Sequence, residues 1–263
     1  MAGVGFRFRD GTSDAAIFES VVQQNEYRLP NRIHADAVIV DIGVHIGSFC
    51  HAVLSRGASR VYGFEADPEN YRCAQRNLAG YGDRVILRHA AVWRSDQRVA
   101  ALHLRDCPEP SNTGWREVFG EDGSSPVAAV PLDEIVRDVT DYGRRRIAML
   151  KIDCEGSEFP ILLTARTLHL VDAIVGEYHE FNSSQYPEPI PAPARVPGYD
   201  RYTMAELAPV LERWGFAVEV KPYPESRLGV FWARRADSRL RGPHLIRRVR
   251  SLMAGSEGFS ARI

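Results

Sequence analysis

The sequence predicts an α/β fold: a doubly wound, mostly parallel sheet with flanking helices and an N-terminal helical cap. From Ala37 onward, short apolar runs alternate with helical segments three times within about 55 residues, as βαβ units do. The runs are rich in valine and isoleucine, which is typical of strands buried on both faces of a parallel sheet. The chain of 263 residues is long enough for one such domain with a few additions.

The first third of the chain supplies the cap and the regular repeats. Residues 14–27 have apolar side chains at helical spacing, so they predict a helix within a cap formed by residues 1–36. A glycine-containing turn and a helix follow the first strand, and a second helix begins at Pro68. The three strands of this part are expected at residues 37–43, 59–67 and 84–93.

The remainder of the chain completes the core, which spans residues 37–233. Asp133 is expected to cap the helix that follows the second of the remaining strands. Residues 105–126 and 182–202 are interrupted by glycine or proline and predict loops, which are candidate lids. A basic tail follows at residues 234–263. The remaining strands are expected at residues 99–104, 126–131, 147–153, 172–181, 216–223 and 228–235.

The composition limits the classes of function. With 33 basic and 34 acidic residues, the net charge is −1, so no strong field favours nucleic acid or an anionic membrane. No apolar run reaches the length of about 18 residues that predicts a membrane span. The N-terminus lacks the apolar centre of a secretory signal, and the four cysteines show no metal or redox spacing. We therefore expect a cytoplasmic protein.

The end of the first predicted strand indicates a cofactor site. Asp41, Gly43 and Gly47 form the pattern D-x-G-x-x-x-G, in which glycines allow a sharp turn close to a ligand. The G-x-G-x-x-G pattern of nicotinamide-binding proteins is absent. An acidic residue on the strand fits a cofactor with positive charge, such as the ammonium and sulfonium of S-adenosylmethionine. A tight turn without a ligand would show the same glycines.

The next two strand ends extend this site. Glu65 lies 24 residues after Asp41, where a carboxylate can accept two hydrogen bonds from a ribose diol. Its alternative is a partner for the dipole of the helix that begins at Pro68. Ala66 follows it and is assigned to the same site. Ala91 ends the third strand and leaves room for adenine, although a buried strand end would look the same.

Several segments in the same order resemble the FkbM family of S-adenosylmethionine-dependent methyltransferases. The resemblance covers roughly residues 26 to 181 and is most specific in LKIDCEGSEFPIL with the IVGEYHEF that follows. It implies the Rossmann-like fold of class I methyltransferases and methyl transfer, usually to oxygen. The family pattern assigns the cofactor to Asp41, Gly43, Gly47 and Glu65, and His45 stands where asparagine is usual. The other segments are NEYRLP, VIVDIGVHIGSF, VYGFEADPENYRCAQRNL and VPLDEI.

Charged side chains at the ends of two later strands are the catalytic candidates: Lys151, Asp153, Glu155, Glu177 and His179. A cluster of this kind is costly to bury unless its members are paired, so it predicts a working site. His179 is the first choice for a general base because imidazole titrates near neutrality. The alternative is a strand-end histidine that binds a neighbouring carboxylate.

The other members of this cluster keep alternative roles. Asp153 is a base, a metal ligand or an orienter of His179. Lys151 orients the substrate, neutralises the carboxylates or forms a structural salt bridge. Glu155 contacts the acceptor or precedes the turn at Gly156. The carboxylates and the imidazole also suit Mg²⁺ or Mn²⁺, but a divalent metal is not favoured because the spacing is not diagnostic.

The leading hypothesis is an O-methyltransferase that acts on a small molecule, namely a natural-product, sugar or lipid hydroxyl or a carboxylate. The first alternative is a nucleotide-dependent oxidoreductase, which the missing glycine fingerprint disfavours. The second is a nucleic-acid methyltransferase, which the charge near zero disfavours. A binding protein without catalysis is a third. The sequence leaves the oligomeric state open.

Overall fold

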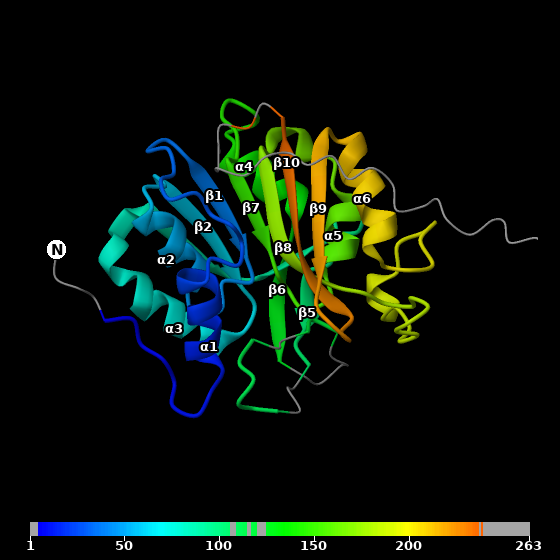
Figure 1. Cartoon of the computed structure of the whole chain (residues 1–263), viewed down its shortest axis with the longest axis horizontal. Helices are drawn as coiled ribbons and strands as arrows, with labels where there is room; N and C mark the ends of the chain where they lie inside the picture. The colour runs from blue at the N-terminus through cyan, green and yellow to red at the C-terminus, as the bar shows by residue number, and fades with distance from the viewer. Residues whose placement is uncertain (1–4, 106–108, 115–116, 120–124, 237, 239–263) are drawn as a thin grey trace, which may run out of the picture.

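A seven-stranded sheet runs through the centre of the computed structural model, which describes residues 5–105, 109–114, 117–119, 125–236 and 238 (Figure 1). The strand order is β3-β2-β1-β7-β8-β10-β9. Because the order moves outward from β1 in both directions, the sheet is doubly wound and its switch point lies between β1 and β7. The strands are β1 (Val38–Ile42), β2 (Arg60–Glu65), β3 (Val85–His89), β7 (Met149–Ile152), β8 (Ala173–His179), β9 (Phe216–Pro222) and β10 (Leu228–Arg235).

The direction of the strands brings the polar strand ends together. Strands β3, β2, β1, β7 and β8 are paired in parallel, and β10 is antiparallel to both of its neighbours. The carboxyl ends of β1, β2, β7 and β8 therefore meet at one edge. The predicted α/β fold with a mostly parallel sheet is confirmed.

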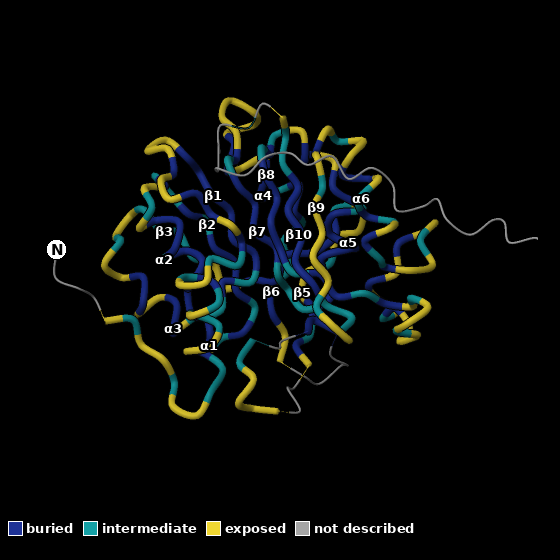
Figure 2. The backbone as a smooth tube through the Cα atoms, viewed as in Figure 1, coloured by how far each residue is buried: buried dark blue, intermediate teal, exposed yellow. Residues whose placement is uncertain are grey.

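Helices cover both faces of the sheet because the side chains of its strands alternate. In β1, Val40 and Ile42 belong to the core cluster under α4, α5 and α6, whereas Ile39 belongs to the cluster under α2 and α3. Figure 2 shows the central strands as the buried layer between them. The helices are α2 (Ser48–Ser55), α3 (Pro68–Leu78), α4 (Leu132–Val139), α5 (Glu158–Thr164) and α6 (Met204–Arg213).

The N-terminal helix is shorter than expected. It comprises α1 (Asp14–Phe18) and a π-helical turn (Glu19–Gln23), and it packs against α2. Of the basic tail predicted at residues 234–263, nearly all lies outside the described residues. Among the residues that are described, no helix has the length and hydropathy that a membrane span needs.

The strand expected at residues 84–93 is two strands. The chain leaves the main sheet at Ala90, and β4 (Ala91–Trp93) joins β6 (Pro126–Pro131) and β5 (Ala101–His103) in a second sheet. The apolar run continues through the break because both strands are packed, so periodicity gives no signal of it. As a result, the backbone at Ala90 and Ala91 turns at the carboxyl edge of the main sheet.

Asp133 does not cap α4, contrary to expectation. Pro131 holds the N-cap position, and Asp133 lies in the first turn with its side chain directed to another segment. Its Oδ1 accepts hydrogen bonds from the backbone N–H groups of Arg166 and Thr167 and from the Thr167 hydroxyl. This carboxylate therefore anchors the end of the α5 segment.

The close approach of β7 and β8 gives a test of the fold. A Cβ at Gly176 would lie 2.0 Å from the carbonyl oxygen of Ile152. We expect Gly176→Ala to lower the free energy of unfolding by about 1–3 kcal/mol, the usual cost of overpacking. Urea unfolding measures the change, and Gly5→Ala, where no atom lies within 4 Å, is the control. Equal stability of the two variants would contradict the strand spacing.

Candidate active site

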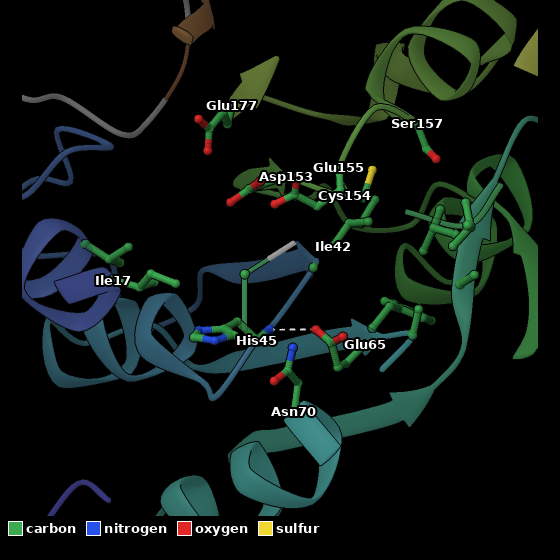
Figure 3. A pocket seen from close by; sticks show the side chains of 18 of the residues that line it. Ile17, Ile42, His45, Glu65, Asn70, Asp153, Cys154, Glu155, Ser157 and Glu177 are labelled. Atoms are coloured by element: carbon green, nitrogen blue, oxygen red, sulfur yellow. Dashed lines mark hydrogen bonds between the residues drawn. The ribbon is translucent and has the colours of Figure 1, made fainter. Parts of the chain in front are cut away.

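A cavity of about 380 Å³ lies at the carboxyl edge of the sheet. Figure 3 shows Glu65 and His45 on one side of it and Asp153, Glu155 and Glu177 on the other. The N-terminal helix and the segment around residue 112 also line it. None of residues 182–202, the second candidate lid, lines the cavity, whereas Asn112, Gly114 and Val118 of the first candidate lid do, and ten residues of that first lid lie outside the described residues. The remaining polar lining residues are Ser20, Glu26, Tyr27, Asn70, Asn112, Ser157 and Tyr223.

The glycine turn after β1 brings two backbone segments into contact. Gly43 has a φ of +77°, and a Cβ there would lie 1.7 Å from the carbonyl oxygen of Asp153. Only glycine therefore lets this turn pack against the chain that follows β7. Gly43 lines the cavity, whereas Gly47 (φ +99°) does not line it and packs against Leu78 of α3. The two glycines predicted for the cofactor thus have different surroundings.

Glu65 is held in place by two backbone hydrogen bonds. Its Oε2 accepts from the N–H of His45 at 2.6 Å and its Oε1 from the N–H of Asp67 at 2.8 Å. The residue is 5% exposed, and burial raises the pKa of its carboxyl to about 7. Each oxygen keeps a lone pair that can accept a further hydrogen bond. Ala66, Ala90 and Ala91 line the adjoining part of the cavity.

Asp41 and Lys151 are buried below the glycine turn and do not line the cavity. The Lys151 ammonium donates hydrogen bonds to the carbonyl oxygens of Ile42 and Gly43. Its Nζ lies 3.4 Å from Asp41 Oδ1 and 3.5 Å from Asp153 Oδ2. Burial alone would lower the pKa of the ammonium, but the carboxylates of Asp41 and Asp153 raise it. The structure thus places both residues in a buried ion pair beneath the cavity.

His179, the first choice for a general base, has the surroundings of the alternative that the sequence left open, a strand-end histidine that binds a neighbouring carboxylate. It is 4% exposed, does not line the cavity and lies between two carboxylates. Its Nε2 is 3.0 Å from Glu155 Oε2, and its Nδ1 is 3.3 Å from Glu158 Oε2. Burial opposes protonation, yet Glu158 and Glu155 raise the pKa of the imidazole well above its ordinary value. The ring is therefore a paired cation that supports the turn after β7.

Glu158 and Glu155 complete that turn. Glu158 is fully buried and accepts hydrogen bonds from the backbone N–H groups of Cys154 and Gly156. Glu155 has a φ of +54°, uncommon for a residue with a side chain. Its carboxylate lines the cavity and is held by His179. The His179 imidazole pairs with both Glu155 and Glu158, and these two ion pairs hold the backbone turn between them.

Asp153 and Glu177 line the cavity on the side opposite Glu65. The Tyr27 hydroxyl donates to Asp153 Oδ2 at 3.1 Å, and that oxygen also faces Lys151. Burial and repulsion from Asp153 raise the pKa of the Glu177 carboxyl to about 9. Glu26 is nearby and accepts a hydrogen bond from the Tyr223 hydroxyl at 2.9 Å. This side is therefore acidic.

Sequence reasoning gave no role to several of these lining residues, among them Glu26, Tyr27, Asn70 and Tyr223. Glu26 and Tyr27 belong to NEYRLP, a segment that carried the family resemblance but received no role. Asn70 lies on α3, where its position in the first turn gave no functional signal. Tyr223 follows β9 in a hairpin and reaches the site only through the fold.

Comparison with known families decides the identity. The family described as the methyltransferase FkbM domain matches residues 41–235, most of the chain. This chain belongs to the FkbM methyltransferase family. It is a methyltransferase, and its methyl donor is S-adenosylmethionine.

Solved structures with similar folds have low sequence identity to this FkbM methyltransferase. Precorrin-6y C5,15-methyltransferase from Geobacter metallireducens is 14% identical, with a TM-score of 0.43 and coverage of 90% of this chain and 97% of that chain. TrmK from M. capricolum, in complex with S-adenosylhomocysteine, is 9% identical, with a TM-score of 0.43 and coverage of 85% and 70%. An rRNA methylase from Streptococcus thermophilus is 10% identical, with a TM-score of 0.40 and coverage of 81% and 94%. No curated protein matches the chain.

The cavity of this FkbM methyltransferase suits its cofactor. The glycine turn offers backbone without a side chain, Glu65 offers two acceptor oxygens, and the alanines leave flat space. In the described part of the chain, no three or more histidine, cysteine, aspartate or glutamate residues form a group that could hold a metal ion.

The position of His179 gives a second prediction. We expect His179→Gln to cost about 3–5 kcal/mol of unfolding free energy at pH 7, because two buried carboxylates lose their cation. Because its pKa is raised in the fold, the wild-type pairing persists through neutral pH and is lost only as the pH rises through that pKa. Urea unfolding measures the loss, and the exposed His34→Gln is the control. Unchanged stability with lost turnover would instead support a general base.

Proposed function

We propose that this protein transfers the methyl group of S-adenosylmethionine to a hydroxyl oxygen of a neutral or cationic small molecule. The observation that carries the proposal is one continuous cavity with two different ends. Glu65 lies at one end, Asp153 and Glu177 lie at the other, and the glycine turn lies between them. The volume of about 380 Å³ falls within the usual range of small-molecule sites.

The residues that would hold the cofactor are those at the first end. Glu65 would accept hydrogen bonds from the ribose diol, and Ala66 and Ala91 would border the adenine. Gly43 and His45 line the cavity between Glu65 and Asp153 and would border the amino-acid portion. When bound, the cofactor supplies a methyl group that is already activated by its sulfonium. The protein therefore has mainly to orient the acceptor and to accept its proton.

Asp153 is the proposed general base. Tyr27 and Lys151 hold its Oδ2, and among the described residues its Oδ1 has no hydrogen-bond partner, so Oδ1 is left to accept a proton from the acceptor hydroxyl. The carboxylate is on the rigid turn after β7, where the packing of Gly43 fixes its backbone. Glu177 is protonated at neutral pH because its pKa is about 9, so it would donate a hydrogen bond to the acceptor. Lys151, Glu155 and His179 would act as supports for these two groups.

The charge of the lining favours some acceptors over others. Five acidic residues line the cavity, and no lysine or arginine is among its described lining residues: Glu26, Glu65, Asp153, Glu155 and Glu177. With Glu177 protonated, the negative charge of the lining comes from the other four. A carboxylate acceptor would meet like charges at short range in a poorly solvated space. A nucleic acid would bring phosphates to the same lining. A hydroxyl on a neutral or cationic molecule meets neither obstacle.

Binding of S-adenosylhomocysteine tests the cofactor end. We expect Glu65→Gln to weaken binding by roughly tenfold to a hundredfold, the loss of a charged hydrogen-bond partner. Because the pKa of Glu65 is raised to about 7, the wild-type dissociation constant should rise, by up to about tenfold per pH unit below 7, as protonation removes the charge and turns one acceptor oxygen into a donor. Calorimetric titration between pH 5 and pH 8 measures both effects. The exposed Glu69→Gln should behave as wild type, and a pH-independent wild type would contradict this role.

A matched set of acceptors tests the catalytic end. Tyramine, tyrosol and 4-hydroxyphenylacetate share a phenol and differ in the charge of the far group. We expect turnover of the carboxylate to be slowest, by at least about tenfold, because of repulsion within the acidic cavity. Formation of S-adenosylhomocysteine is the measurement.

Asp153→Asn completes that experiment. It should lower turnover by about 10²–10⁴-fold while product binding changes little, as expected for loss of a general base. Asp138→Asn, an exposed substitution on α4, is the control. Fastest turnover of the carboxylate, or full activity of Asp153→Asn, would refute the proposed chemistry.

A further inference from the structure

Two segments distant in sequence cover the cavity together. The N-terminal helix contributes Ala16, Ile17, Ser20 and Val21 to the lining, and residues 109–114 contribute Asn112 and Gly114. The segments touch, since a Cβ at Gly114 would lie 3.2 Å from Ile17 Cδ1. We call these two segments the cover.

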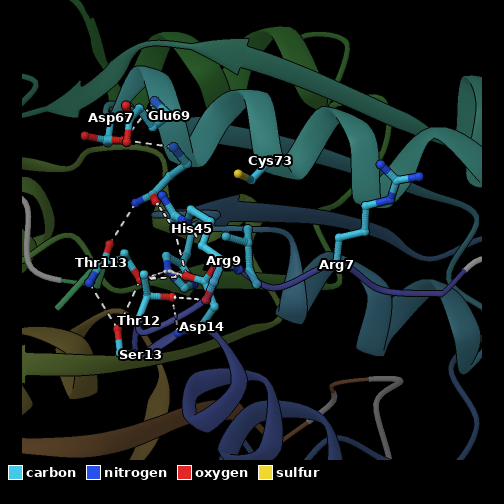
Figure 4. Close-up of polar contacts among 12 residues, drawn as sticks. Arg7, Arg9, Thr12, Ser13, Asp14, His45, Asp67, Glu69, Cys73 and Thr113 are labelled. Atoms are coloured by element: carbon cyan, nitrogen blue, oxygen red, sulfur yellow. Dashed lines mark hydrogen bonds and ion pairs between the residues drawn. The ribbon is translucent and has the colours of Figure 1, made fainter. Parts of the chain in front are cut away.

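The Asp14 carboxylate joins the two parts of the cover (Figure 4). Asp14 is fully buried. Its Oδ2 accepts from the backbone N–H and the Nε of Arg9, each at 2.9 Å, and a terminal guanidinium nitrogen of Arg9 lies 2.8 Å from Oδ1. The Thr113 hydroxyl donates to Oδ1 at 2.7 Å, and His45 Nε2 is 3.3 Å from the same atom. One carboxylate thus binds groups from three parts of the chain.

Further hydrogen bonds surround this carboxylate. The backbone N–H of Thr113 donates to the Ser13 hydroxyl, and the backbone N–H of Ser13 donates to the Ser111 carbonyl. Asn70 on α3 donates to the Thr113 carbonyl and accepts from Arg9. Burial opposes the ionisation of Asp14, but hydrogen bonds from His45, Arg9 and Thr113 hold the pKa of its carboxyl well below the usual range. The network is therefore charged at every ordinary pH.

The network continues to Glu65 through one residue. His45 has a φ of +54°, a conformation that residues with side chains adopt rarely. In this conformation its backbone N–H points to Glu65, and its ring is held at Nε2 by Thr113, at 2.9 Å, and by Asp14. The contacts of the ring thus secure the backbone that orients the Glu65 carboxylate.

We propose that Asp14 is a positioning residue for the cofactor: it closes the cover over the cavity and, through His45, orients Glu65. The inference rests on the proposed placement of the cofactor beside Glu65. The contacts of Asp14 oppose separation of the two segments of the cover, and we expect such separation to speed entry and release of the cofactor. Asp14 does not touch the reacting atoms, so it controls cofactor exchange and not methyl transfer.

The test is the dissociation rate of S-adenosylhomocysteine, followed by a chase of the radiolabelled compound with excess unlabelled compound. We expect Asp14→Asn, which removes the charge that pairs with Arg9, to raise the rate by about tenfold or more. Thr113→Val keeps the pair of Asp14 with Arg9 and removes the hydroxyl that contacts Asp14, the His45 ring and Ser13, so a smaller rise, of about threefold, is expected. Asp10 is exposed and lies four residues before Asp14, so Asp10→Asn is the matched control and should leave the rate unchanged.

Hydrogen exchange of the same variants separates positioning from general stability. We expect faster exchange at residues 13–23 and 109–114 in Asp14→Asn, with β1, β7 and β8 unchanged. The KM for the methyl donor should rise more than kcat falls. Unchanged dissociation in both variants, or faster exchange throughout the central sheet, would overturn the role of Asp14. Failure of the wild type to bind S-adenosylhomocysteine would instead remove the proposed cofactor site.

Discussion

The site depends on the hydrogen bonds and ion pairs of the Lys151 ammonium. The ammonium is buried where the two central strands end, and it binds the carbonyl oxygens of the β1 turn and two carboxylates at once. Without this cation, Asp41 and Asp153 would place two negative charges in a space with little water. With it, the turn at Gly43 packs against the chain after β7, and that contact fixes the backbone of Asp153. Asp153, the proposed general base, thus lies on a turn that contacts from both central strands hold in place.

The ion pairs of this region also explain why the cavity is acidic. Lys151 and His179 are the cations of this region, and both are occupied by carboxylates that shape the turn after β7. Glu177 forms no ion pair in the part of the chain that the structure describes. The raised pKa of its carboxyl reflects the free-energy cost of ionising it in this position. A cationic or hydrogen-bonding ligand would offset that cost. Groups that destabilise the empty fold and are stabilised by a ligand are common in binding sites.

Sequence reasoning predicted which polar residues lie at the strand ends. It could not predict which of their side chains reach the cavity, because tertiary contacts decide that. Parallel strands must present their carboxyl ends at one edge, so Gly43, Glu65 and Asp153 could be placed together from their positions alone. The register that puts Asp41 opposite Lys151 is not encoded locally, and so the use of this lysine as a support was one of several alternatives. His179 and Glu177 share a strand face, yet only Glu177 reaches the cavity because the turn at residues 153–157 covers the strand end. Glu26 and Tyr27 reach the site because the N-terminal segment folds back over the sheet, which no periodicity reveals.

The cover links the architecture of the cap to the chemistry below it. Methyl transfer between two bound molecules requires their alignment, and a cavity closed from solvent limits the orientations that each can adopt. Here the closing contacts and the orienting contacts share residues: the ring of His45 binds the cover, while its backbone N–H binds Glu65. Separation of the cover therefore loosens Glu65, and a ligand that hydrogen-bonds Glu65 favours the closed arrangement by the same free energy. Cofactor binding and closure of the cavity are therefore coupled equilibria, because both depend on the contacts of His45.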